Sequence, residues 1–280
     1  MRKIFAKDIT SVVAALCIKS NYEMRSDLQK ALKNAFNSEK NKLSKEILSK
    51  LLENEQIAYN EKIPMCQDTG MVIVFLELGQ DVHICNGNLY DAINDGVRKG
   101  YKNGYLRKSV VSDPILRKNT NDNTPAVIYT EIVPGNKLKI TVMPKGFGSE
   151  NKSSVKMLIP SDGVEGIEKF VLETVRNAGP DSCPPYVVGV GIGGTMEKAG
   201  FLSKKALLRK LGGFNKLSHI AKLEKKLLKE INKLKIGVQG FGGKITALAV
   251  NVEVYPTHIA GLPVAVTLSC HAFRHEEIII

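Results

Sequence analysis

The chain has 280 residues, of which 43% are hydrophobic and 24% are charged, and its formal net charge is +12. This composition supports a folded core, and no apolar run reaches the roughly 18 residues that a membrane-spanning helix needs. The apolar N-terminal stretch is interrupted by Lys7 and Asp8, so we interpret it as a helix of the protein and not as a secretion signal. We therefore expect a soluble cytoplasmic protein.

The positive charge is spread along lysine-rich amphipathic segments. Tryptophan is absent and aromatic residues make up only 6% of the chain. A nucleic-acid-binding protein would favour arginine interleaved with aromatic side chains, so a nucleic-acid partner is disfavoured. An anionic substrate or an acidic partner chain remains possible alongside a simple solvated surface.

Three amphipathic helices are predicted in the first 60 residues. Asp8 is placed to cap the first helix, Ser26 or Asp27 opens the second, and Ser44 starts the third. The run MVIVFLEL at 71–78 follows, and its continuous apolar character is typical of a buried strand.

The remainder of the chain mixes helices and strands. Pro134-Gly135-Asn136 separates two strand-like runs and predicts a β-hairpin. We expect one domain over residues 1–280, of mixed α/β class, with mixed sheets surrounded by helices. The expected elements are helices at 88–105, 162–178, 195–211 and 216–235, and strands at 126–133, 137–144, 186–190, 245–255 and 262–269.

Two glycine-rich motifs suggest nucleotide binding but lack its other requirements. GVGIGG at 189–194 matches the dinucleotide pattern, yet the acidic residue expected about 20 residues later is replaced by a basic segment. QGFGGK at 239–244 has the wrong glycine spacing, and Ile245 stands where a magnesium-binding hydroxyl would be needed. Glycines that permit tight packing explain the first motif better.

Three of the five cysteines lie at turn-like positions. Cys66 precedes Gln67-Asp68-Thr69-Gly70, Cys183 precedes two prolines, and Cys270 follows a strand, whereas Cys17 lies on an apolar helix face. The cysteines are too few and too widely spaced for a disulfide scaffold or a zinc ribbon. Thiolates on loops suit an iron–sulfur cluster, and three ligands in place of four leave one iron open to act as a Lewis acid.

Polar residues near these cysteines suit small anions. Arg107 can grip a carboxylate through two hydrogen bonds, and the loop GFGSENKSS offers backbone N–H groups together with Lys152. Taken alone, this loop is equally well explained as a simple turn. His258, twelve residues before Cys270, is by itself more typical of a surface or packed histidine.

The segments MCQDTG, LRKSVVSDP, GSENKS, CPPYVVGVGIGG and THIAGLPVAVTLSCHAFR resemble the class I (iron–sulfur) fumarate hydratases and the related L-tartrate dehydratases. The similarity covers roughly residues 5–275. The chain stops where the single-chain enzymes continue into a second domain, so its length resembles the α subunit of the two-subunit form.

The resemblance implies a [4Fe–4S] cluster held by Cys66, Cys183 and Cys270, with one iron not ligated by protein. It implies a substrate site for a small dicarboxylate, to which Lys152 is added from the reading of the glycine-rich loop. The remaining active-site residues would come from a β subunit, within a heterotetramer. The residues expected at the site are Gln67, Asp68, Arg107, Gly148, Lys152 and His258.

The expected reaction is the reversible hydration of fumarate to (S)-malate, and two alternatives remain. We expect Arg107 to neutralise a carboxylate, Asp68 to move a proton, and His258 to hydrogen-bond the substrate or the leaving water. L-tartrate dehydration differs by one hydroxyl group, and the sequence does not separate the two substrates. From another class, the chain could be an iron–sulfur electron carrier, although four cysteine ligands would then be expected.

Overall fold

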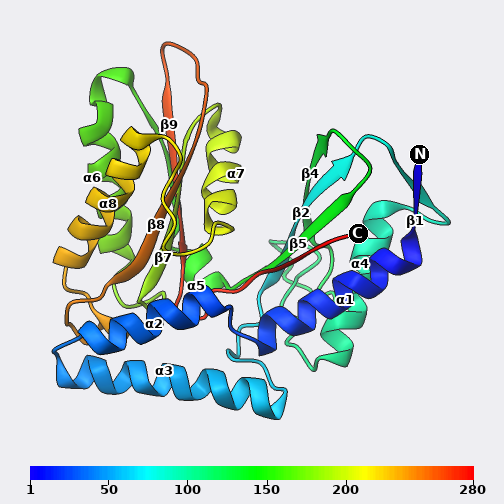
Figure 1. Cartoon of the computed structure of the whole chain (residues 1–280), viewed down its shortest axis with the longest axis horizontal. Coiled ribbons are helices and arrows are strands. Elements are labelled where there is room, and N and C mark those ends of the chain that lie inside the picture. The colour runs from blue at the N-terminus through cyan, green and yellow to red at the C-terminus, as the bar shows by residue number, and fades with distance from the viewer. The chain divides into compact units, whose positions relative to one another are not determined.

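The computed structural model describes residues 1–280, and the chain divides into two compact units (Figure 1). Unit 1 contains Met1–Arg25, Asn54–Phe147 and Arg274–Ile280, and unit 2 contains Ser26–Glu53 and Gly148–Phe273. The mixed α/β class is confirmed. Each unit combines segments that are far apart in the chain. The expectation of one domain over residues 1–280 stays a prediction.

The main sheet of unit 1 has the strand order β10-β5-β2-β4. Strand β2 pairs in parallel with β4 and antiparallel with β5, and β5 pairs antiparallel with β10. A separate two-stranded sheet joins β1 and β3 in parallel. The strands are β1 (Arg2–Phe5), β2 (Met71–Gly79), β3 (Val82–Cys85), β4 (Val127–Val133), β5 (Leu138–Lys145) and β10 (Glu276–Ile279).

The predicted hairpin of β4 and β5 is wrong, because β2 lies between these two strands. The turn that joins them passes over the end of β2, where the Gly79 N–H donates to the Lys137 carbonyl at 2.9 Å. A Cβ atom on Gly79 would lie 2.4 Å from the Gly135 oxygen, so the crossing requires a residue without a side chain. The turn residues were recognised correctly, but the partner strand was not.

The core of unit 1 forms between the sheet and two helices, α1 (Ala6–Tyr22) and α4 (Leu89–Asn103). Helix α4 begins as predicted, with the Asn88 side chain accepting hydrogen bonds from the N–H groups of the first turn. The fully buried members of this core include Ile9, Val13, Val72, Val74, Ile93, Val97, Leu138 and Ile140. These side chains alternate along β2 and β5 and repeat at helical spacing along α1 and α4.

The predicted helix starts in the first 60 residues are partly wrong. Helix α1 begins at Ala6, so Asp8 lies within its first turn and is not its cap. Helix α2 (Ser26–Ser38) begins at the expected residue. Helix α3 (Lys42–Glu61) begins before Ser44, whose N–H donates to Asn41 Oδ1 at 3.1 Å. Asn41 is thus the side chain that satisfies a free N–H group at this helix start.

Unit 2 contains a four-stranded sheet with the order β6-β9-β7-β8. In Figure 1, helices α6 and α8 lie on one face of this sheet and α7 lies on the other. The strands are β6 (Ser154–Leu158), β7 (Tyr186–Gly193), β8 (Ala247–Tyr255) and β9 (Leu262–Ser269). The α-helices are α5 (Phe147–Glu150, at the boundary with unit 1), α6 (Gly163–Ala178), α7 (Met196–Leu207) and α8 (Ser218–Lys233), and short 3-10 turns cover Pro160–Asp162 and Val238–Gly240.

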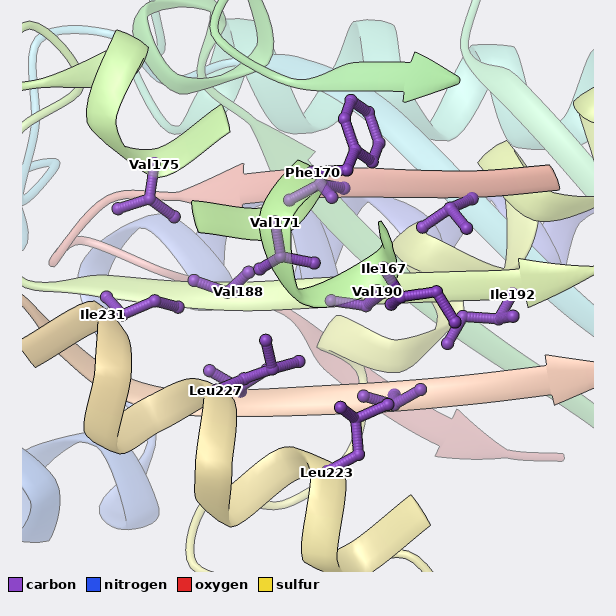
Figure 2. Packing of buried hydrophobic residues seen from close by; sticks show 14 of the residues in the cluster. Ile167, Phe170, Val171, Val175, Val188, Val190, Ile192, Leu223, Leu227 and Ile231 are labelled. Atoms are coloured by element: carbon purple, nitrogen blue, oxygen red, sulfur yellow. The ribbon is translucent and has the colours of Figure 1, made fainter. Parts of the chain in front are cut away.

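Figure 2 shows the core between this sheet and the helices α6 and α8. Val188 and Val190 of β7 pack with side chains from both helices. No helix of the chain is both long and apolar enough to cross a membrane. Full burial of one such aliphatic side chain contributes about 1.5–3 kcal/mol. The labelled residues are Ile167, Phe170, Val171, Val175, Val188, Val190, Ile192, Leu223, Leu227 and Ile231.

The GVGIGG motif lies within strand β7 and its end, where its glycines permit close packing. A Cβ atom on Gly189 would lie 2.1 Å from the Ser203 oxygen, and one on Gly191 would lie 2.1 Å from the Ala199 oxygen. Both oxygens belong to helix α7, whose backbone therefore approaches the strand directly. The packing interpretation of this motif is confirmed.

The end of the QGFGGK loop is held by a carboxylate from the same unit. Glu39 Oε2 accepts hydrogen bonds from Lys244 N at 2.8 Å and Ile245 N at 3.3 Å, and Oε1 accepts from Lys40 N at 2.8 Å. Burial acts to raise the pKa of Glu39, but these backbone hydrogen bonds outweigh it and lower the pKa below its usual value. The loop is thus closed by Glu39.

Candidate functional site

The MCQDTG segment of unit 1 forms a turn between α3 and β2 that fixes a carboxylate. Asp68 Oδ1 accepts a hydrogen bond from Gly70 N at 3.0 Å, and Oδ2 accepts one from Phe147 N at 2.8 Å. Gly70 adopts a positive φ of 81°, which favours glycine at this position. Each oxygen of Asp68 is therefore held by a separate backbone donor.

The base of this turn is attached to a buried tyrosine. The Tyr101 hydroxyl lies 2.7 Å from the backbone carbonyl oxygen of Thr69 and 2.8 Å from that of Gly70, and Tyr101 is fully buried. Burial raises the pKa of Tyr101 well above its usual value, so the hydroxyl stays a donor. Tyr101 could not be recognised from the sequence, because a tyrosine within a helical pattern gives no indication of such a contact.

Arg107 is brought to the same turn. Its carbonyl accepts a hydrogen bond from Thr69 Oγ1 at 3.0 Å, while its side chain is exposed and forms no ion pair. Cys66 is partly exposed, and its thiol lies 3.5 Å from Gln67 Oε1. Unit 1 therefore places a free thiol, an amide, a fixed carboxylate and an unpaired guanidinium on neighbouring backbone segments.

Unit 2 brings Cys183 and Cys270 close together. The N–H of His271, next to Cys270, donates to the Cys183 oxygen at 3.2 Å. Cys183 has a positive φ of 55°, which is uncommon for a residue with a side chain. Burial first, and then the charges of Cys183, Asp181 and Cys270, outweigh the hydrogen bond with Ser182 and raise the pKa of Tyr186 to about 12. The two thiols thus share one environment at the end of β9.

Gln239 secures this cysteine environment and was missed by the sequence analysis. Its backbone N–H and its side-chain Nε2 both donate to the Pro184 oxygen, each at 2.8 Å, and Nε2 also lies 3.0 Å from His271 Nδ1. The residue holds a positive φ of 51°. Gln239 belongs to the QGFGGK motif, whose glycines suggested only a phosphate loop.

The glycine-rich loop lies beside the same pair of cysteines. Lys152 Nζ forms an ion pair with Asp181 Oδ2 at 2.7 Å, two residues before Cys183. Ser153 Oγ accepts a hydrogen bond from Leu268 N at 3.1 Å, close to the end of β9. Gly148 is exposed, and a Cβ atom there would meet nothing within 4 Å. Gly148 therefore leaves open space, whereas Lys152 already has an anionic partner.

His258 lies apart from the cysteine pair of its unit. It occupies the loop between β8 and β9, is exposed, and accepts a hydrogen bond at Nδ1 from Ala260 N at 3.2 Å. Cys270 follows the opposite end of β9. At about 3.3 Å per residue, the strand separates the two residues by roughly 25 Å. His258 therefore cannot touch a molecule bound at the cysteines of its own chain.

The donors present are chemically suited to an iron–sulfur cluster. None of the five cysteines forms a disulfide, and Cys66, Cys183 and Cys270 are the three that lie in loops outside the apolar core. Cys17 is fully buried, and burial raises its pKa to about 12, which makes it a poor ligand. No group of three or more His, Cys, Asp or Glu side chains is gathered closely enough to hold a metal ion. Cys66 belongs to unit 1 and the other two thiols belong to unit 2.

Comparison with known proteins gives one consistent family. The model of the family described as "Fumarate hydratase (Fumerase)" matches residues 10–279. A Methanocaldococcus jannaschii chain is 43% identical over 272 residues, covering 95% of each chain, and carries a provisional description as an L(+)-tartrate dehydratase subunit alpha. The L(+)-tartrate dehydratase subunit alpha of Escherichia coli K12 is 31% identical over 275 residues, covering 97% of this chain and 90% of the relative. The chain belongs to the fumarate hydratase (Fumerase) family.

Proposed function

We propose that the chain is the α subunit of a hydro-lyase that hydrates fumarate reversibly to (S)-malate. The observation that carries this proposal is the turn of unit 1, where Asp68 is fixed by two backbone N–H groups beside the Cys66 thiol and the unpaired Arg107. A dicarboxylate needs a cation to bind it, and proton removal beside a carboxylate needs a positioned base. Family membership supports the same reaction class.

The proposed cofactor is a [4Fe–4S] cluster held by Cys66, Cys183 and Cys270, with one iron not ligated by protein. This assignment requires Cys66 of unit 1 to meet the thiol pair of unit 2, and none of the three cysteines is in a disulfide. When bound, such a cluster supplies a Lewis acid for the substrate hydroxyl group. The Gln239 contacts to Pro184 and His271 would hold two of the thiols in place.

The chain's own residues would bind and orient the dianion. Arg107 would form a bidentate pair with one carboxylate, and the Gln67 amide would hydrogen-bond the substrate. Gly148 is an exposed residue next to Phe147, whose N–H holds Asp68, and it would offer its backbone N–H to the substrate. Asp68 would hold or move the proton at the carbon next to a carboxylate, because its two backbone contacts fix the carboxylate in one orientation. Lys152 would take part only by leaving Asp181.

His258 can act at this site only from a second copy of the chain. The length of β9 separates it from Cys270 by roughly 25 Å within one chain. Its exposed loop is available for contact with another subunit. A hydrogen bond from His258 to the substrate is therefore proposed together with a heterotetramer of α and β subunits, in the cytoplasm, where the β subunit supplies the remaining active-site residues.

L(+)-tartrate dehydration to oxaloacetate is the second candidate function. The relatives from Escherichia coli carry that name at 31–32% identity, and the Methanocaldococcus jannaschii chain carries a provisional form of it at 43%. Tartrate has one more hydroxyl group than malate, so the site would need one more polar contact. The two substrates would use the same thiols, the same Arg107 and the same Asp68.

The test is anaerobic purification of the chain with and without its β partner, followed by fumarate and tartrate assays. We expect turnover only with the β partner, bound iron and sulfide, and a change in the cluster spectrum when substrate is added. Cys66→Ser should lower iron content and abolish turnover, whereas the matched variant Cys85→Ser, at another partly exposed cysteine of unit 1, should change neither.

Three results would contradict the proposal. Colourless reconstituted protein without iron or sulfide would remove the cluster. Appreciable turnover by the α chain alone would remove the division of the active site between subunits. A stable cluster that undergoes redox cycling and ignores both substrates would favour an electron carrier.

A further inference from the structure

Arg274 is a buried cation beside the Asp68 turn that the proposed reaction does not yet use. It begins the C-terminal segment of unit 1, four residues after Cys270, and is 3% exposed. Its Nη2 donates to the Asp68 carbonyl oxygen. Its Nε and Nη1 are buried and have no hydrogen-bond acceptor among the protein atoms. No aspartate or glutamate pairs with it.

The guanidinium and the Asp68 carboxylate face the same small space at Gly146. A Cβ atom on Gly146 would lie 3.2 Å from Asp68 Oδ2 and 3.9 Å from Arg274 Nη2. These two distances limit the separation between Oδ2 and Nη2 to at most 7.1 Å. The carboxylate itself is held by backbone N–H groups and not by the guanidinium. Arg274 therefore acts on the turn through one hydrogen bond and through its charge.

Stability does not explain an arginine at this position. A buried charge without an ion pair opposes folding, and replacing it by an apolar side chain of similar volume is often neutral or stabilising. The single hydrogen bond to the Asp68 carbonyl could be made by a neutral amide. A charge that is retained in spite of this cost points to a partner with the opposite charge, and the proposed substrate is a dianion.

We propose that Arg274 is a positioning residue that orders the Gln67–Asp68 turn and offsets the negative charge that collects there when a dicarboxylate binds. This inference rests on the proposed function and deepens it. The hydrogen bond from Nη2 orients the backbone from which Asp68 projects. The positive charge acts over a short distance in a region of low dielectric, where it is weakly screened.

Three substitutions separate the hydrogen bond from the charge. Arg274→Lys keeps the charge, Arg274→Gln keeps a donor without the charge, and Arg274→Met keeps neither. With the β partner and the accepted substrate, we expect kcat/KM to fall about 100-fold in Gln and Met variants, mainly through KM, and about tenfold or less in the Lys variant. Hydrogen exchange on the α chain alone should show faster exchange at residues 65–70 in the Met variant than in the Gln variant.

A matched control separates these effects from a general loss of stability. Arg209→Met in unit 2 removes the ion pair with Glu224, whose side chain is fully buried. We expect this control to lower the Tm without raising KM, and Arg274→Met to leave the Tm unchanged or higher.

The inference is overturned if Arg274→Gln equals or exceeds Arg274→Lys in kcat/KM, if all three variants behave as wild type, or if Arg274→Met loses more thermal stability than Arg209→Met. If the wild-type complex converts neither fumarate nor tartrate, the proposed function fails instead. Hydrogen exchange in the α chain then still decides whether Arg274 orders the turn, because that measurement needs no substrate.

Discussion

Replacing Asp68 by asparagine changes both the chemistry and the structure of the turn. The carboxylate uses one oxygen for Gly70 N and the other for Phe147 N. Asparagine has one side-chain oxygen and one NH₂ group, so it can satisfy only one of these two donors. The other N–H would then face an NH₂ group. A loss of turnover in Asp68→Asn alone would therefore not establish a role in proton transfer.

The expected loss of stability follows from these contacts. A hydrogen bond to a charged group contributes about 1.5–3 kcal/mol, and the partial exposure of Asp68 places the expected loss at about 1–2 kcal/mol. In a chain of this size, 1 kcal/mol shifts the Tm by roughly 2–4 °C. Asp68→Asn should therefore lower the Tm of the α chain by roughly 2–8 °C.

The assay combines thermal unfolding of the α chain with turnover of the complex, measured well below the Tm of the variant. Loss of general acid–base catalysis is expected to reduce kcat by about 100-fold or more, beyond what unfolding explains. Asp113→Asn is the matched control for stability. Its two backbone donors, Ile115 N and Leu116 N, both bond to Oδ1, so asparagine can keep both contacts and the Tm should not change.

Two outcomes would refute this reasoning. An unchanged Tm in Asp68→Asn would mean that the two N–H contacts do not hold the turn. Wild-type turnover in the same variant would mean that Asp68 transfers no proton. A lowered Tm together with wild-type turnover would leave Asp68 with a structural role only.

Three further predictions concern stability and thiol chemistry. Gly191→Ala should destabilise unit 2 by about 1–3 kcal/mol through overpacking, as measured by denaturant unfolding. Gly200→Ala, which has open space around it in helix α7, should stabilise unit 2 by up to about 1 kcal/mol. Equal effects of the two substitutions would contradict the packing argument. Burial acts to raise the pKa of Asp122, but hydrogen bonds from Thr124 and Arg98 outweigh it and lower the pKa to about 2. The stabilising contribution of the Asp122 carboxylate is therefore present above about pH 4 and is lost as the pH falls toward 2. Asp122→Asn should show a smaller loss of stability than the wild type over that range. A thiol reagent at about pH 8 should leave Cys17 unmodified in the native α chain, because burial raises the pKa of this thiol to about 12. Intact mass measures the number of modified cysteines, and rapid modification of Cys17 would contradict its burial.

Much of the fold could be predicted from the sequence because its local signals agree with the final structure. The run at 71–78 became the buried central strand β2, and the helix expected over 88–105 is α4 (Leu89–Asn103). The arrangement of strands could not be predicted in the same way. The short turn at Pro134–Asn136 is compatible with a hairpin, and only the position of β2 between the neighbouring strands excludes it. Strand β10 was missed because its pairing with β5 joins distant parts of the chain.

The candidate site was predicted from sequence motifs, and such motifs point to residues whose side chains can bind a metal, carry a charge or transfer a proton. Cys66, Asp68 and Arg107 were named from the sequence, and unit 1 brings them onto neighbouring segments. Tyr101 and Arg274 were missed, because their contacts are with backbone oxygens whose positions depend on the fold. His258 is close to Cys270 in the sequence, but strand β9 lies between the two residues and separates them in space.

Because unit 1 is built from distant segments of the chain, its parts are synthesised at different times. Residues 1–25 and 54–147 of unit 1 leave the ribosome long before residues 274–280, which supply Arg274 and the outer strand β10. Most of unit 2, residues 148–273, is translated after these segments and before residue 274. The sheet of unit 1 therefore exposes the edge of β5 until β10 pairs with it, and an intermediate in which residues 274–280 are not yet in place would be prone to aggregate along that edge.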